Sequence, residues 1–174
     1  TTQATEVAEM MFYQDLQDVV MVATSTGGLI ASKTATLARD RIARAGLAGQ
    51  VEFKLQDYRD ERGHYDGIAS IEMFEAVGEQ YWPVYFQTLR ERLKPGKAAT
   101  LQIITVDHRR WPVYKRGVDF IQKYIFPGGM LPSETALKDQ FQSAGLRHDG
   151  VTYFGQDYAR TCREWARDFN ANWD

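Results

Sequence analysis

Two glutamates, Glu72 and Glu75, lie three positions apart in the otherwise apolar stretch SIEMFEAVG. An ionised carboxylate among apolar neighbours costs free energy unless another group pairs with it or hydrogen-bonds to it. Carboxylates perturbed in this way are common in functional clefts, although a carboxylate at the positive end of a helix is the structural alternative. We predict that Glu75 belongs to a functional site and that Glu72 is a structural or cofactor-adjacent support.

The elements that would position these carboxylates alternate along the chain. Helical periodicity predicts helices over residues 33–45, 80–93, 118–124, 133–144 and 161–169. Strand patterns cover residues 51–55, 65–70, 98–106 and 150–155, and VVMVAT at residues 19–24 is one more candidate strand. This alternation predicts one α/β domain with a doubly wound, mostly parallel sheet.

Local signals predict where some of these elements begin and end. Lys94-Pro95-Gly96 predicts the end of the helix that precedes the strand at residues 98–106. That strand is a continuous apolar run, which is typical of a strand covered on both faces. Ser133 is a suitable N-cap for the helix that follows it.

Polar residues follow several of the predicted strands. Asp57 comes just after the strand at residues 51–55, and Gln102 to Thr105 closes the strand at residues 98–106. In doubly wound sheets, ligands bind outside the carboxyl ends of the strands. We therefore expect these residues to gather with the two glutamates at one edge of the sheet.

The composition indicates a globular chain without bulk affinity for nucleic acid. The 174 residues are 44% hydrophobic and 25% charged, which excludes disordered and fibrous classes. A formal net charge of -2 gives no general attraction to nucleic acid or to an anionic membrane. Any contact with lipid would have to be local.

The cysteine and histidine content restricts the compartment and the chemistry. The single cysteine, Cys162, excludes an internal disulfide and is compatible with a reducing compartment. The histidines His64, His108 and His148 are scattered without ligand spacing, so we predict no metal site. No apolar run approaches the length of a membrane span, and the opening residues lack a signal-peptide pattern. We expect a cytoplasmic protein.

Four stretches together resemble the cyclopropane-fatty-acyl-phospholipid synthases and the related mycolic acid cyclopropane synthases. They are VEFKLQDYRD, the run from Tyr65 to Thr105, FIQKYIFPGGMLPS and YFGQDYARTCREW. SIEMFEAVG combined with IFPGGMLPS is far more specific than a general methyltransferase signal. The resemblance covers residues 28–174 and implies a class I, Rossmann-like methyltransferase fold that depends on S-adenosylmethionine. Residues 1–27 are then an atypical N-terminal segment.

The resemblance implies a reaction as well as a fold. In the family, a methylene is added across the cis double bond of an unsaturated phospholipid acyl chain, and a bound bicarbonate is implied as the base. A peripheral position at the inner membrane face would follow. The implied catalytic positions are Glu75, the backbone of Ile104, and Tyr158 in GQDYART. The family's histidine position is Gln102, which cannot relay a proton as imidazole does. Methylation of an alkene, or of another acceptor, therefore stays open beside ring formation.

The resemblance also assigns residues to the cofactor. Asp57 and Tyr58 match the loop on the adenine side, where a carboxylate can accept from the adenine amino group. The other residues assigned to S-adenosylmethionine are Ser32, Lys33, Arg59 and Ile71.

Parts of the family pattern have no counterpart in this sequence. The glycine-rich cofactor loop is not found upstream of Ser32, and the family extends beyond both ends of the chain. We therefore expect an incomplete sheet. The alternative to an enzyme is a truncated or degenerate homologue that acts as a structural or interaction module. Such a chain would form a homo-oligomer by covering its exposed sheet edge.

Overall fold

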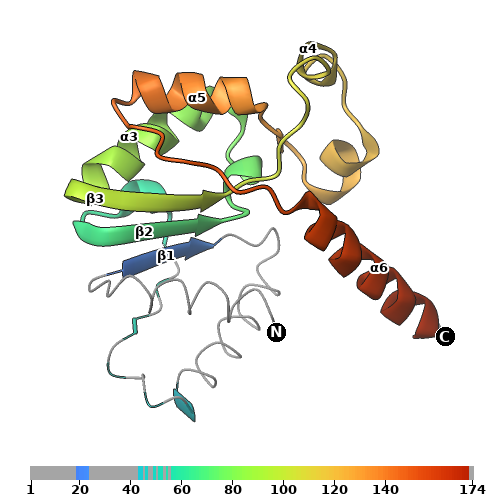
Figure 1. The fold of residues 1–174 in the computed structure, drawn as a ribbon, viewed down its shortest axis with the longest axis horizontal. Helices are drawn as coiled ribbons and strands as arrows, with labels where there is room; N and C mark the ends of the chain where they lie inside the picture. Colours follow the sequence, from blue (N-terminus) through green and yellow to red (C-terminus); the bar gives the residue numbers. More distant parts are fainter. Residues whose placement is uncertain are drawn as a thin grey trace.

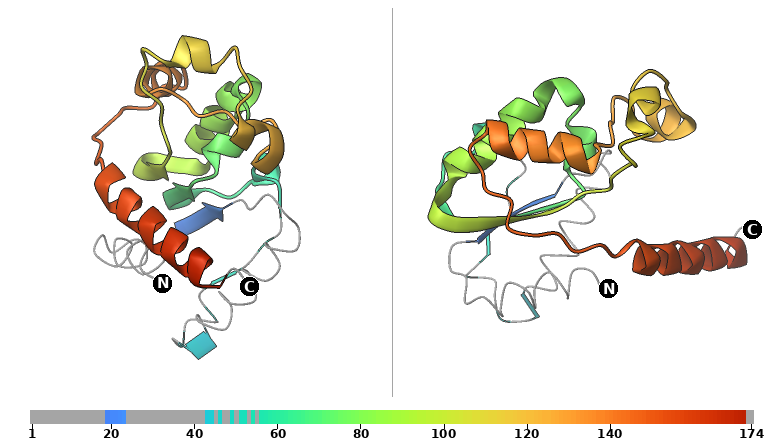
Figure 2. Two further views of the ribbon diagram at one scale, coloured as in Figure 1. Left: turned by 90° about the vertical axis from the view of Figure 1, so that its right-hand side faces the viewer. Right: turned by 45° about the horizontal axis from the view of Figure 1, so that its top comes forward.

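The computed structural model describes residues 19–23, 43–44, 46, 49, 51–52, 54 and 56–172. Its centre is a parallel sheet with the strand order β1-β2-β3, formed by Val19–Ala23, Tyr65–Ile71 and Leu93–Gln102. Helices α3 (Trp82–Arg92) and α5 (Glu134–Ser143) cover one face of this sheet (Figure 1). Helices α4 (Trp111–Tyr114) and α6 (Gly155–Ala171) lie beyond the carboxyl ends of the strands (Figures 1 and 2).

The hydrophobic core lies where α3 packs against its neighbours. The Phe74 ring packs against Trp82, Tyr85 and Phe86 at centroid distances of 5.0, 5.1 and 5.2 Å. Phe86 also meets Phe141 of α5 edge-on at 5.1 Å. Trp82 and Phe86 are 1% and 0% exposed. The apolar face predicted for this helix is therefore confirmed, and it attaches α3 firmly to the rest of the domain.

Several predicted elements are confirmed. The candidate strand in VVMVAT forms β1 and pairs in parallel with β2, which extends the predicted strand at residues 65–70 by one residue. The N-cap prediction for Ser133 is confirmed as well, because its Oγ accepts a hydrogen bond from Ala136 N at 3.2 Å. The short helix predicted at residues 118–124 is a single wide turn at Ile121–Ile125.

The helix end predicted at Lys94-Pro95-Gly96 is confirmed, since α3 ends at Arg92, but these three residues do not form a separate turn. Strand β3 begins directly after α3, with Leu93 opposite Tyr65, and regular pairing resumes with Ala98 opposite Gly67. Gly96 lies between these pairs with a φ of 77°, a conformation that glycine adopts without steric cost. The three residues therefore form an irregularity inside the strand.

The strand predicted at residues 98–106 is shorter and less covered than expected. It ends at Gln102. Ala98 and Thr100 are exposed, whereas Leu101 packs against the core. Coverage on both faces is wrong for the described residues, because α3 and α5 lie on the same face of the sheet (Figure 1).

Two other strand predictions are not met. The described residues of the segment at 51–55, which are Val51, Glu52 and Lys54, do not form a strand. Residues 151–154 are irregular, and α6 begins at Gly155. The helix predicted at residues 33–45 lies outside the described residues, apart from a helical pair at 43–44.

Candidate functional site

The first of the two glutamates joins the ends of β2 and β3. Glu72 N donates to the carbonyl oxygen of Gln102 at 3.0 Å, and Gln102 Nε2 donates to Glu72 Oε1 at 2.9 Å. Glu72 has a φ of 48°, and among the described residues it is the one non-glycine residue with positive φ. A strained backbone of this kind persists only when its surroundings hold it, and such residues gather at functional sites.

The second glutamate is held from two directions. Glu75 Oε1 accepts a hydrogen bond from Ile104 N at 2.6 Å, and the Glu75 carbonyl oxygen accepts one from Met130 N at 2.8 Å. Its second carboxyl oxygen, Oε2, is buried and has no hydrogen-bond partner among the described residues. A buried carboxyl oxygen without a partner is costly, so this atom is suited to a proton or to a ligand.

The environment of Glu75 favours its protonated form. Burial raises the pKa of the Glu75 carboxyl, the Ile104 N–H opposes that rise, and the charge of Glu72 adds to it. A carboxyl group held in this way can keep or exchange a proton closer to neutral pH than an exposed glutamate can.

We expect the free energy of unfolding of the Glu75→Gln variant to fall less with rising pH than that of the unchanged protein. Burial raises the Glu75 pKa in the folded chain, so the folded state binds more protons than the unfolded state above the ordinary value of 4.5. The free energy of unfolding therefore falls as pH rises from the ordinary pKa to the raised one, and glutamine removes this contribution. Urea unfolding at a series of pH values from about 4 to about 7 measures it.

A matched variant, Glu91→Gln on the exposed side of α3, separates this effect from a general change of charge. A hydrogen bond from Gln87 lowers the pKa of Glu91. The free energy of unfolding of Glu91→Gln should therefore still fall with rising pH, as it does in the unchanged protein. An unchanged pH dependence in Glu75→Gln would contradict the assignment.

The tyrosine predicted for the site comes from α6. Burial raises the pKa of the Tyr158 hydroxyl, and the nearby charges of Glu72 and Glu75 raise that pKa further. Tyr158 N donates to the Phe154 carbonyl oxygen at 3.0 Å, which sets the first turn of the helix. The structure thus brings Tyr158 to the same place as the glutamates.

All the predicted catalytic positions meet at this edge. We use the name carboxylate cluster for Glu72, Glu75, Gln102, Tyr158 and the Ile104 backbone. Their chemical roles remain predictions. The sequence missed the pairing of Glu72 with Gln102, because nothing in the spacing of residues thirty positions apart shows which strand ends adjoin.

The residues assigned to the adenine side form a separate, exposed group. Asp57 Oδ1 accepts from Arg59 N and from Arg59 Nε, both at 2.9 Å, and Arg59 Nη2 donates to Asp57 Oδ2 at 2.5 Å. These hydrogen bonds lower the pKa of Asp57 to about 2. The half-buried ring of Tyr58 meets Tyr85 edge-on at 5.6 Å, and the Arg59 guanidinium lies 6.0 Å from the ring centroid of Tyr81.

The structure says less about the other residues predicted to bind the cofactor. Ile71 is the half-buried last residue of β2. Ser32 and Lys33 lie outside the described residues. Next to Ile71, the sequence missed a buried pair in which Tyr85 Oη donates to Ser70 Oγ at 2.8 Å. Burial raises the pKa of this tyrosine to about 12, so it stays a hydrogen-bond donor.

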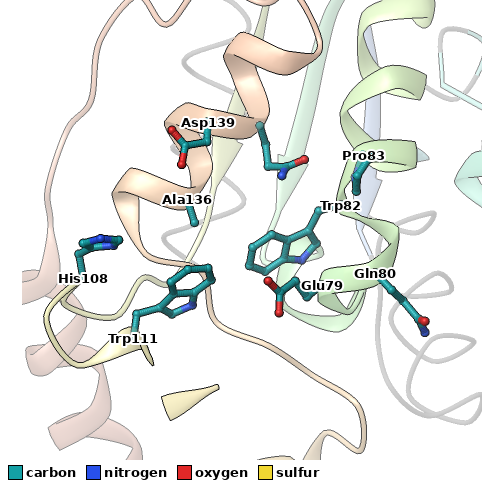
Figure 3. Close-up of a pocket in the computed structure, with 9 residues that line it drawn as sticks. Glu79, Gln80, Trp82, Pro83, His108, Trp111, Ala136 and Asp139 are labelled. Carbon is teal, nitrogen blue, oxygen red and sulfur yellow. The ribbon is translucent and has the colours of Figure 1, made fainter. Parts of the chain in front are cut away.

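A cavity of about 310 Å³ lies apart from the carboxylate cluster, between α3, α5 and the start of α4 (Figure 3). The indoles of Trp82 and Trp111 line it, nearly parallel at a centroid distance of 6.2 Å. Glu79 on its wall forms an ion pair with Lys115, whose Nζ lies 4.4 Å from the Trp111 ring centroid. None of the predicted site residues lines this cavity.

Two kinds of feature are absent from the described part of the chain. No three His, Cys, Asp or Glu side chains among the described residues are grouped so that they could hold a metal ion. In the same part of the chain, no helix combines the length and the apolar character needed to cross a membrane.

Comparison with known proteins gives matches over most of the chain. The family model described as mycolic acid cyclopropane synthetase matches residues 17–174. Tuberculostearic acid methyltransferase UfaA1 of Mycobacterium tuberculosis is 45% identical over 134 residues, which cover 76% of this chain and 31% of the relative. Cyclopropane-fatty-acyl-phospholipid synthase of Escherichia coli K12 is 36% identical over 124 residues, covering 71% of this chain and 31% of the relative. The chain spans about a third of the length of these relatives.

The solved structures agree on the fold. Mycolic acid cyclopropane synthase CmaA1, solved with SAH and CTAB, superposes with a TM-score of 0.67 at 22% identity. The superposition covers 99% of this chain and 71% of that one. The described chain therefore has the class I, Rossmann-like methyltransferase fold, with a small parallel sheet.

Proposed function

Because this chain belongs to the mycolic acid cyclopropane synthetase family, we propose that it is part of an S-adenosylmethionine-dependent methyltransferase. Its acceptor is the cis double bond of an unsaturated phospholipid acyl chain. The observation that carries this proposal is the carboxylate cluster, in which Gln102 and Tyr158 surround Glu72 while Ile104 N holds Glu75. A cluster of proton acceptors at the carboxyl edge of the sheet suits a reaction that must release a proton.

The described residues on the adenine side fit the cofactor. The pKa of Asp57 is lowered to about 2, so its side chain is a carboxylate at neutral pH and can only accept hydrogen bonds, as an adenine amino group requires. Tyr58 lies beside it and offers the free part of its ring. When bound, S-adenosylmethionine supplies an electrophilic methyl group, and addition of that group to an alkene leaves a carbocation on the acyl chain.

The chain's own residues then have to remove one proton. We assign this role to Glu72, because Gln102 Nε2 fixes one of its carboxyl oxygens at 2.9 Å and the strained backbone fixes its direction. Glu75 is less suited, because burial raises its pKa and favours the protonated form, which cannot accept a proton. Glu75 and Tyr158 instead position Glu72 and keep water away from the cation.

The bicarbonate that the resemblance implies does not fit these residues. An anion needs hydrogen-bond donors, and two donors of the cluster already serve the carboxyl groups: Ile104 N binds Glu75, and Gln102 Nε2 binds Glu72. The negative charge of Glu72 would also repel a bound anion. No step of the proposed reaction therefore passes through bicarbonate.

We further propose that the product is a methylene-branched chain and not a ring. After methyl addition, a hydride shift places the cation on the carbon that carries the methyl group, and loss of one methyl proton to Glu72 leaves a double bond there. Ring closure releases the same single proton, so both routes balance. The relative named as a methyltransferase, at 45% identity, and the amide at Gln102 support the branched product.

Incubation of the protein with S-adenosylmethionine and vesicles of an unsaturated phospholipid tests this proposal. We expect chains with one added carbon, and gas chromatography with mass spectrometry of their methyl esters should identify a methylene branch. Cyclopropane chains would contradict the proposed product. Titration calorimetry with S-adenosylhomocysteine is the control, and a folded sample that does not bind it would favour the non-catalytic alternative.

A further inference from the structure

The motif IFPGGMLPS has no part in the reaction proposed above, although its last five residues are bonded to the carboxylate cluster. We call these residues, 129–133, the GMLPS strip. Met130 N donates to the Glu75 carbonyl oxygen at 2.8 Å, and Val106 N donates to the Pro132 carbonyl oxygen at 2.9 Å. The strip therefore joins Glu75 to the loop that follows β3.

These contacts close a ring of hydrogen bonds around Glu75. Its carboxyl group accepts from Ile104 N at 2.6 Å, two residues before Val106, while its carbonyl oxygen accepts from Met130 N, two residues before Pro132. Three segments of the chain are thus tied to one another in pairs. A reacting group needs rigid support of this kind to stay in its productive position.

Other side chains fix the middle and the end of the strip. Trp111 Nε1 donates to the Leu131 carbonyl oxygen at 3.2 Å, and Leu131 N donates to Tyr114 Oη at 3.4 Å. The hydroxyl of Ser133, which is 0% exposed, lies 2.8 Å from His108 Nδ1. The strip is therefore held along its length by the segment at residues 106–114.

Gln122 fixes the beginning of the strip. Its side chain is only 9% exposed, and its Nε2 donates to the Gly129 carbonyl oxygen at 3.2 Å. Its Oε1 accepts from Asp119 N at 3.0 Å, and its own N–H donates to Asp119 Oδ1 at 2.8 Å. A buried amide with these partners has one favourable position, and that position sets where Gly129 lies.

Gly129 approaches Glu75 more closely than a larger residue could. A Cβ atom added at Gly129 would lie 3.2 Å from the Glu75 carbonyl oxygen and 3.0 Å from the Phe126 carbonyl oxygen. Alanine at this position would therefore push the strip and Glu75 apart. At Gly117, an added Cβ would meet nothing within 4 Å.

We propose that the GMLPS strip positions the carboxylate cluster and that Gln122 is the positioning residue that fixes the strip. Gln122 acts on Glu75 through Gly129 and Met130. Its loss should displace Glu75 and Ile104 N and leave the adenine-side residues in place. The inference rests on the proposed function only in its effect on methyl transfer, because the effect on Glu75 is measurable in the protein alone.

Urea unfolding of Gln122→Met between about pH 4 and about pH 7 tests the inference without a methyl donor. Methionine keeps the side-chain length but cannot donate to Gly129. In the unchanged protein, burial raises the Glu75 pKa, so the free energy of unfolding falls with rising pH. Once the strip moves, water reaches Glu75, and we expect this fall to shrink towards that of Glu75→Gln. A purely structural role would lower the free energy of unfolding equally at every pH.

A double variant assigns the change to Glu75. The titratable groups that face Glu75 are Glu72, Tyr85 of α3 and Tyr158 of α6, and burial raises the pKa of both tyrosines, which stay neutral in this pH range. In the Glu75→Gln background, Gln122→Met should not alter the pH dependence further. A further change would place the effect on another group and overturn the inference.

A second variant and two matched controls guard against a folding defect. Gly129→Ala should reduce the fall with rising pH as Gln122→Met does. Gly117→Ala, and the same methionine substitution at Gln142, which is exposed on α5, should keep the fall of the unchanged protein. Circular dichroism checks that each variant is folded. The same pH dependence in all folded variants would overturn the inference.

Methyl transfer to vesicles of an unsaturated phospholipid gives an independent measurement. Gln122→Met should transfer roughly tenfold to a hundredfold more slowly, because small misplacements of reacting groups are costly, while its affinity for S-adenosylhomocysteine stays unchanged. Transfer at the normal rate by Gln122→Met would overturn the positioning role. Absence of transfer by the unchanged protein would contradict the proposed function, and the unfolding measurements would still decide whether Gln122 positions Glu75.

Discussion

Replacing Phe86 by alanine should lower the free energy of unfolding by about 3–5 kcal/mol. Phe86 is 0% exposed and its ring contacts Phe74, Tyr85 and Phe141 at centroid distances of 5.1 to 5.2 Å. Removing the ring leaves a cavity between α3 and α5 that rigid aromatic neighbours cannot fill. Urea unfolding followed by circular dichroism measures the loss.

The control for this prediction is the same substitution at an exposed phenylalanine. Phe120 is 65% exposed, so Phe120→Ala should change the free energy of unfolding by less than about 0.5 kcal/mol. Similar losses at the two positions would mean that the contact between α3 and α5 does not form the core.

Replacing Glu72 by glutamine should lower the rate of one-carbon transfer by roughly 10²- to 10⁴-fold, the usual effect of removing a general base. Glutamine keeps the side-chain shape and can still accept a hydrogen bond from Gln102, so the change removes mainly the ability to take a proton. Single-turnover measurements on vesicle-bound substrate would report this step directly. The loss should be the same with and without added bicarbonate.

Two measurements separate this chemical role from a structural one. The affinity for S-adenosylhomocysteine should be unchanged in Glu72→Gln. Glu134→Gln, at an exposed carboxylate that is paired with Lys138 on α5, should transfer at the normal rate. Retention of activity by Glu72→Gln would show that another group accepts the proton. Restoration of that activity by bicarbonate would contradict the mechanism proposed for this chain.

The parts of the fold that were predictable have strong local signals. The α3 helix has apolar residues at helical spacing over three turns, and α5 begins at a serine that caps it through its own side chain. The failures lie where tertiary contacts override such signals. The run at Lys94-Pro95-Gly96 is a turn by composition, yet pairing with β2 absorbs it into a strand. Residues 150–155 alternate as a strand does but find no described partner strand.

The sequence predicted which residues form the site, but not which hydrogen bonds join them. The family resemblance assigned Glu75, Gln102, Ile104 and Tyr158 to the site, and the structure brings them together. It did not reveal that the two donors expected for an anion are occupied by the protein's own carboxyl groups. Hydrogen bonds between residues about thirty positions apart depend on which strands adjoin and in which register, and single-sequence patterns do not contain that information.

The sequence by itself determined the family, the α/β class and the residue types available for chemistry, because these follow from composition, periodicity and motifs along the chain. Only the tertiary structure decided that Glu72 pairs with Gln102 and that Glu75 Oε2 is buried without a partner. It also decided that Gln122 faces inward while its apolar neighbours face outward. The physical reason is that burial and hydrogen bonding depend on the three-dimensional neighbours of each group. The same type of side chain can therefore lie in the core or at the surface, and can keep or lose its proton, according to where the fold places it.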